Sequence, residues 1–151
     1  MRRMLLLVLA LAVAVSVPAL GASSTKLKAK MTGGAEVPKG NPKASGSATF
    51  TIAANGKSIK YTLSAKKLSG PVIAAHMHFG KKGTAGPVII PICAKACKLP
   101  KHGTLTAKNF TKAPGVSSFA AAVKDMKAGK TYVNVHTQKF PAGEVRGQIT
   151  K

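Results

Sequence analysis

The chain has 151 residues, and its 24 Lys and Arg residues stand against only 3 Asp and Glu, a formal net charge of +21 at pH 7. Arg2, Arg3 and Arg146 are the only arginines, so lysine carries almost all of this charge. Lysine lacks the planar fork that reads phosphate and guanine bidentately, and the chain has no Trp and only 5% aromatic residues to stack on bases. These features exclude sequence-specific nucleic-acid recognition. They favour an anionic cell-surface polymer as partner or, alternatively, a lysine surface that is merely solvated.

The N-terminus has the pattern of a signal peptide. Met1 to Met4 are cationic, residues 5–17 are apolar, and small residues at positions 19–22 offer a cleavage site. The apolar run is shorter than the roughly 20 residues of a membrane-spanning helix. We therefore predict a signal peptide at 1–22, a mature domain at 23–151 with no transmembrane anchor after cleavage, and a secreted, periplasmic or cell-surface location; an uncleaved anchor is the alternative. Cleavage leaves 22 basic and 3 acidic residues, a net charge of +19.

Most of the mature chain alternates between apolar and polar residues, which is the period of a β-strand with one buried face. The clearest pair lies on either side of Asn55-Gly56, the strongest short signal for a hairpin. Residues 32–42 are rich in Gly and Pro and are predicted to form a loop. The predicted strands cover residues 27–31, 46–53, 58–64, 72–79, 88–90, 103–107, 131–137 and 144–149.

Residues 117–129 carry the only helical signal. A serine can cap the start, Phe119, Val123 and Met126 share one face, and Gly129 can end the helix in the left-handed conformation. Many short strands with regular turns and one short helix predict an all-β fold. We expect an Ig-like or superoxide-dismutase-like antiparallel β-sandwich with the helix before the penultimate strand.

Cys93 and Cys97 are the only two cysteines. In an oxidising compartment, an even count predicts one local disulfide. A metal-binding pair is the alternative, although a structural zinc site needs four ligands and the chain has no second Cys pair.

Three of the four histidines lie on polar strand faces. His76 and His78 alternate along one predicted strand, and His136 lies on another. Three imidazoles can form an open copper or zinc site. The alternative is a structural network in which the histidines bond to Asn134, Glu144 and backbone carbonyls, and in which Arg146 shares a face with Glu144. The sequence leaves both interpretations open.

The sequence argues against an enzyme. A Ser-His-Asp triad would have to recruit Asp125 from the polar side of the predicted helix, and Glu36 and Glu144 are not placed as a carboxylate pair. A glycine-rich phosphate loop of the required spacing is also missing. We therefore predict no catalytic residues.

Several motifs of the mature chain resemble the chordin-type (CHRD) domain. The resemblance spans about residues 26–151 and implies an exported, extracellular β-stranded domain. Such domains are repeated in the growth-factor antagonist chordin and stand alone in exported microbial proteins. The motifs are Gly34-Ala-Glu-Val-Pro38, Gly46-Ser-Ala-Thr-Phe50, Ala75-His-Met-His78 with Gly86-Pro-Val88, and Tyr132-Val-Asn-Val-His-Thr137 with Gly143-Glu-Val-Arg-Gly-Gln-Ile149.

A fainter resemblance concerns Cu/Zn superoxide dismutase. His76-Met-His78-Phe-Gly80, and the later strand with Val135-His136, look like the copper-ligand strands of that family. The resemblance implies a shared fold and a copper site, without the bridging histidine and zinc ligands that dismutase activity uses.

Two hypotheses for function follow. The first is an exported, non-enzymatic module that binds a protein or an anionic cell-surface polymer, or has a structural role, at the cell surface or in the extracellular space. The second is a copper- or zinc-binding protein that holds the ion through His76, His78 and His136.

Overall fold

The computed structural model describes residues 23–151, and the predicted signal peptide lies outside this range. The fold is all-β, as predicted, with one short α-helix. The strands are β1 (Thr25–Thr32), β2 (Ser45–Ile52), β3 (Ser58–Lys66), β4 (Val72–Phe79), β5 (Val88–Cys93), β6 (Lys101–Thr106), β7 (Thr131–Thr137) and β8 (Val145–Gln148); the helix is α1 (Phe119–Lys127), and the 3-10 turns are η1 (Gly33–Ala35) and η2 (Ala107–Asn109).

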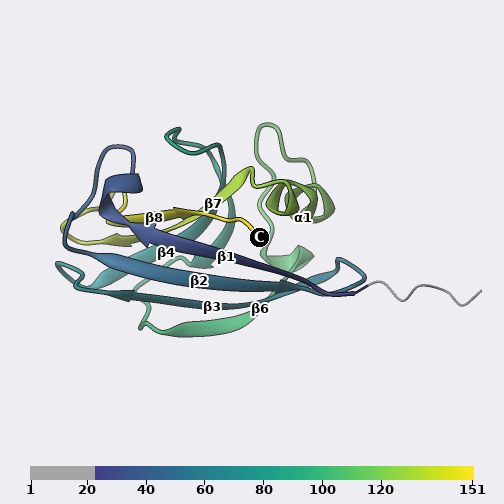
Figure 1. Ribbon diagram of the computed structural model, residues 1–151, viewed down its shortest axis with the longest axis horizontal. Helices are drawn as coiled ribbons and strands as arrows, with labels where there is room; N and C mark the ends of the chain where they lie inside the picture. Colours follow the sequence, from purple (N-terminus) through teal and green to yellow (C-terminus); the bar gives the residue numbers. More distant parts are fainter. Residues whose placement is uncertain (1–22) are drawn as a thin grey trace, which may run out of the picture.

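The eight strands form one sheet in the order β5-β4-β7-β8-β1-β2-β3-β6, and every neighbouring pair is antiparallel. The sheet curls so that its two halves face each other, with β1, β2, β3 and β6 on one side and β4, β7 and β8 on the other (Figure 1). The halves meet where β1 contacts β8 through the pair Thr32 and Arg146 and the bridge between Lys28 and Thr150. This sparse pairing lets a single sheet fold over like a sandwich.

The apolar core fills the space between the halves. Leu27, Met31 and Phe50 from one half and Met77 and Val133 from the other belong to the same cluster, each at most 3% exposed. Each strand contributes alternate residues, because side chains in a strand point to opposite faces. The period-two pattern of the sequence is therefore the pattern of this core.

The β2–β3 hairpin confirms the Asn55-Gly56 signal. Ile52 pairs with Ile59 across the turn, and Gly56 has a φ of 67°. That conformation suits glycine, which lacks the Cβ that makes positive φ costly.

Strand β5 is longer than the sequence pattern predicts. The strand predicted from the sequence ends at residue 90, whereas β5 continues through Pro91 to Cys93. The sheet order explains this, because β5 is an edge strand and one side of its backbone needs no partner. The Cys93–Cys97 loop starts at the last residue of this strand. Its two sulfur atoms lie 2.08 Å apart, which is the distance of the predicted disulfide.

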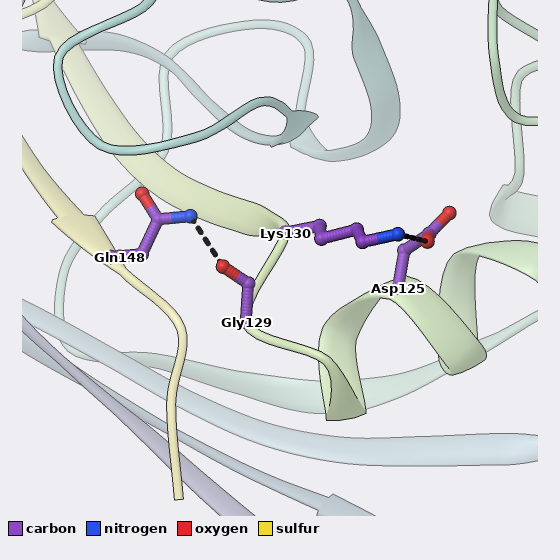
Figure 2. Close-up of polar contacts among 4 residues, drawn as sticks. All are labelled: Asp125, Gly129, Lys130 and Gln148. Atoms are coloured by element: carbon purple, nitrogen blue, oxygen red, sulfur yellow. Dashed lines mark hydrogen bonds and ion pairs between the residues drawn. The ribbon is translucent and has the colours of Figure 1, made fainter.

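Helix α1 begins and ends as its sequence indicates and precedes the penultimate strand. The Ser118 hydroxyl accepts a hydrogen bond from the Ala121 N–H at 3.1 Å, and Gly129 follows the helix with a φ of 70°. Figure 2 shows the connection to β7, where the Gln148 amide donates to the Gly129 carbonyl at 2.9 Å and Lys130 pairs with Asp125 at 3.9 Å. The helix thus covers one end of the curled sheet (Figure 1). No helix within residues 23–151 has the length and apolar character needed to cross a membrane.

Candidate metal centre

The three predicted histidines come together on the outer face of the β4-β7-β8 half. In the sheet register, His76 lies opposite Asn134, His78 opposite Tyr132, and His136 opposite Ala74. Strand β7 is buried on both faces, because its valines face the apolar core while loops cover its polar face. The polar face is therefore a second, hydrophilic interior.

The histidine nitrogens converge on a small volume. His76 Nδ1 lies 3.1 Å from His136 Nε2, and one nitrogen from each of the three rings lies within 4.8 Å of the others. Two Zn–N bonds of about 2.0–2.1 Å at a tetrahedral angle place their nitrogens about 3.3 Å apart. The His76 and His136 pair thus already has nearly the separation of two ligands on one ion.

Two loops fix the ring orientations of His78 and His136. His78 Nδ1 lies 2.8 Å from the Gly86 carbonyl, and His136 Nδ1 lies 2.9 Å from the Pro141 carbonyl. A carbonyl oxygen only accepts, so both Nδ1 atoms carry the proton and donate it. In each neutral ring the lone pair is then on Nε2. A backbone carbonyl that orients an imidazole in this way is typical of metal-ligating histidines.

The contact between His78 and the Gly86 carbonyl requires the backbone at Gly86 to lie very close to the backbone of Phe79. A Cβ at this position would collide with the Phe79 carbonyl oxygen at the end of β4. Glycine therefore lets the loop fold back on the strand and present its carbonyl to His78.

Asn134 lies between the two Nε2 atoms. Its Oδ1 is 3.1 Å from His78 Nε2 and 3.0 Å from His136 Nε2. Asn134 also acts to lower the pKa of the Glu36 carboxyl, which places that carboxyl near the cluster. Asn134 thus joins the Nε2 atoms of His78 and His136 in one polar cluster, which continues to His76 because His136 Nε2 lies 3.1 Å from His76 Nδ1.

Burial keeps the three imidazoles neutral. Desolvation lowers the pKa of His76 to about 4, helped by the neighbouring His136 and His78, and desolvation also lowers the pKa values of His78 and His136. Neutral imidazole is the form that binds a metal ion, so the ligands need not lose a proton near pH 7.

A stack of three side chains supports His78 from the neighbouring strands. The Tyr132 ring lies parallel to His78, with centroids 4.7 Å apart, and the Arg146 guanidinium lies 3.4 Å from the Tyr132 centroid. Arg146 is 2% exposed and donates to the Lys81 carbonyl at 2.8 Å. The stack is a cation–π arrangement that places one buried positive charge beside the cluster.

Glu144 does not join the histidines. Its Oε1 accepts hydrogen bonds from the Asn41 amide and from the N–H and hydroxyl of Ser69, and its Oε2 accepts from the Thr137 hydroxyl at 2.5 Å. Although burial alone would raise its pKa, these bonds lower it below the usual range. In the structural alternative, Glu144 bonds to the histidines; in the fold its carboxylate instead ties the start of β8 to the end of β7 and to the loops that hold Asn41 and Ser69.

Glu36 is the acidic residue that lies beside the cluster, and sequence reasoning missed it. Burial raises its pKa to about 7, although Arg146 and Asn134 act to lower it. Gly143 makes room for its side chain, since a Cβ there would collide with Glu36 Oε1. One signal was available: Glu36 is one of only three acidic residues and lies within an otherwise small, apolar loop motif.

A family model, the CHRD domain, matches residues 27–149, nearly the whole described chain. CHRD domains are extracellular and are not a known enzyme family. The chain matches none of the curated proteins and none of the solved structures with which it was compared. The fainter resemblance to copper-ligand strands stays a prediction.

Proposed function

The chain belongs to the CHRD domain family, and we propose that it is an exported, non-enzymatic binding module whose three-histidine cluster binds copper or zinc. Export is supported by the N-terminal sequence pattern and by the extracellular occurrence of the family. An epitope-tagged chain expressed in its native host should be recovered outside the cytoplasm and should lack residues 1–22. Recovery of the uncleaved chain from the cytoplasm would contradict export.

The observation that carries the metal proposal is the convergence of three neutral imidazoles with fixed orientations. The Nε2 atoms of His78 and His136 lie 3.1 Å and 3.0 Å from the same Asn134 atom, and His76 Nδ1 lies 3.1 Å from His136 Nε2. Three nitrogen ligands with an open position suit copper and zinc better than magnesium or calcium, which take oxygen ligands.

The test is calorimetric titration of the purified protein with Zn(II), Cu(II) and Cu(I) near neutral pH. We expect one ion per chain with submicromolar affinity, and loss of this binding in the variant His76→Ala/His78→Ala/His136→Ala. His102→Ala is the matched control, because His102 is exposed on β6 and away from the cluster. Equal binding by the parent and the triple variant would overturn the proposal.

A second binding function is favoured by a specific surface. The outer face of the β1-β2-β3 half carries rows of lysine and hydroxyl side chains, because Lys26, Thr51 and Lys60 are register neighbours, as are Lys28 and Thr49. Lys26, Lys28 and Lys60 are exposed. We propose that this face binds an anionic cell-surface polymer, with attraction that weakens as salt screens the charges.

Heparin chromatography tests this second function. The variant Lys26→Gln/Lys28→Gln/Lys60→Gln should elute at lower salt than the parent. The control Lys95→Gln/Lys98→Gln/Lys139→Gln removes the same charge from exposed lysines elsewhere. Equal shifts for both variants would mean that net charge, rather than this face, sets retention.

A further inference from the structure

An open groove of about 1010 Å³ lies at the helical end of the molecule, away from the histidine cluster. It runs between the β2–β3 turn, the η2 turn and helix α1. Ala107, Phe119, Ala120 and Val123 form its apolar floor. A volume of this size is at the upper end of the range for small-molecule sites.

All the charged residues that line the groove are lysines. Lys57 comes from the β2–β3 turn, Lys108 from η2, and Lys124 and Lys127 from α1, and all four are exposed. No acidic side chain lines the groove within the described residues. The nearest acidic residue in sequence, Asp125, pairs with Lys130 instead, while Glu36 and Glu144 are buried. The positive field at the rim is therefore uncompensated by the protein.

The floor exposes too little large hydrophobic surface to be a protein-docking face. Phe119 and Val123 are only 7% and 6% exposed, and Val37 is the single large hydrophobic side chain that is exposed among residues 23–151. A protein interface of this kind would need a broad apolar patch. The methylene stems of the rim lysines extend the apolar wall while their ammonium groups stay in water. An apolar floor with lysines at its rim suits a ligand that has an aliphatic chain and a negative head.

We propose that this groove binds a single-chain anionic amphiphile of the fatty-acid class. The aliphatic chain would lie on the floor formed by α1 and η2, and the carboxylate would be held among the rim lysines. The apolar contacts would supply most of the affinity, and the lysines would select a charged head over a neutral one. The site is separate from the metal centre, so either one can fail in experiment without the other.

The first test compares two ligands that share a chain. Dodecanoate, titrated below its micelle concentration into the purified protein, should bind saturably with one molecule per chain. Dodecanol, which has the same chain and a neutral head, should bind at least about tenfold more weakly, a difference of about 1.4 kcal/mol. Absence of saturable dodecanoate binding would overturn the proposal, and equal affinity for dodecanol would overturn the role of the lysines.

Two variants locate the site. Ala120→Asp places a negative charge in the floor near the start of α1, where an acidic residue suits the helix dipole and folding should be preserved. It should weaken dodecanoate binding by about tenfold or more, because a buried ligand chain would face a charge. Ala94→Asp makes the same substitution at an exposed position outside the groove and should bind like the parent.

The variant Lys124→Glu/Lys127→Glu should also weaken dodecanoate binding, and Lys95→Glu/Lys98→Glu is its charge-matched control. If both variants lost dodecanoate affinity equally, the effect would come from net charge, and the groove would not be the binding site. Cooperative thermal unfolding of Ala120→Asp at nearly the parent's midpoint would show that the variant is folded, whether or not the protein binds a metal.

Discussion

Glu36 is a buried carboxyl beside a buried arginine, and its pKa of about 7 makes the protein's stability depend on pH. Its Oε1 has no hydrogen-bond partner among the described residues. Because the folded state holds the proton more tightly than the unfolded chain, Glu36 reduces stability as the pH rises from 4.5 to 7.

The substitution Glu36→Gln removes this titration while it keeps the shape of the protonated carboxyl. We expect the free energy of unfolding of the variant, relative to the parent, to increase across pH 4.5 to 7 by up to about 3 kcal/mol. Urea unfolding at a series of pH values measures the difference. A difference that stays constant with pH would contradict the raised pKa.

Glu144 has the opposite environment, since four donors satisfy its carboxylate. Glu144→Gln keeps the size of the side chain but turns an amide NH2 toward at least one of these donors. We expect a loss of about 2 kcal/mol in the free energy of unfolding, the cost of unmaking charge-assisted bonds in a buried site.

Urea midpoints at unchanged m-value measure this loss. Ser69→Ala removes only one of the donor side chains and should cost less, about 1 kcal/mol. If the two variants unfolded at the same urea concentration as the parent, the carboxylate network would not contribute to stability.

At the scale of single elements, helix α1 depends on its N-cap, because a helix this short has few other ways to satisfy its first N–H groups. Ser118→Ala removes the acceptor for the Ala121 N–H and should lower the free energy of unfolding by about 1 kcal/mol. Ser117→Ala is the control, since Ser117 is an exposed neighbour outside the cap. Equal effects of the two substitutions on the thermal midpoint would contradict the capping role.

Elements of this kind were predictable because their signals are local. The Asn55-Gly56 turn, the Ser118 cap and the Gly129 terminus each act within a few residues, and the structure confirms all three. The predicted end of β5 at residue 90 was wrong. A proline such as Pro91 fits within a strand only at a sheet edge, and the apolar–polar alternation of a sequence does not show which strands lie at an edge.

The candidate site was predictable in part for the same reason. Alternation placed His76 and His78 on one face, and His136 on the polar face of its own strand. The carbonyls that orient two of the rings belong to loops at Gly86 and Pro141, and the Glu36 carboxyl arrives from the loop after β1. No sequence period links these loops to the strands, so the groups that orient the rings could be identified only in the folded chain.

At the scale of the whole molecule, the dominant feature is the charge of +19 on residues 23–151. Only one ion pair, between Lys130 and Asp125, is formed among the described residues, and β1 places Lys26, Lys28 and Lys30 on one exposed face. Like charges at this density repel one another and oppose the compact state.

Salt should therefore stabilise the folded protein. The Debye length falls from about 30 Å at 0.01 M to about 8 Å at 0.15 M, so added NaCl screens repulsion between distant lysines first. We expect the thermal midpoint to rise between these two concentrations. The lysines are closer together in the folded state than in the expanded unfolded chain, so screening reduces their repulsion more in the folded state.

Differential scanning calorimetry in NaCl measures this rise, and the variant Lys26→Gln/Lys28→Gln/Lys60→Gln sharpens the interpretation. With three fewer charges on one face, the variant should begin with a higher midpoint at 0.01 M and gain less from added salt. If the parent and the variant gained equally, the effect would come from salt acting on apolar hydration rather than on charge. If the thermal midpoint fell as salt was added, attraction between opposite charges would outweigh the repulsion between lysines. The described residues form only one ion pair, so this outcome would contradict the prediction.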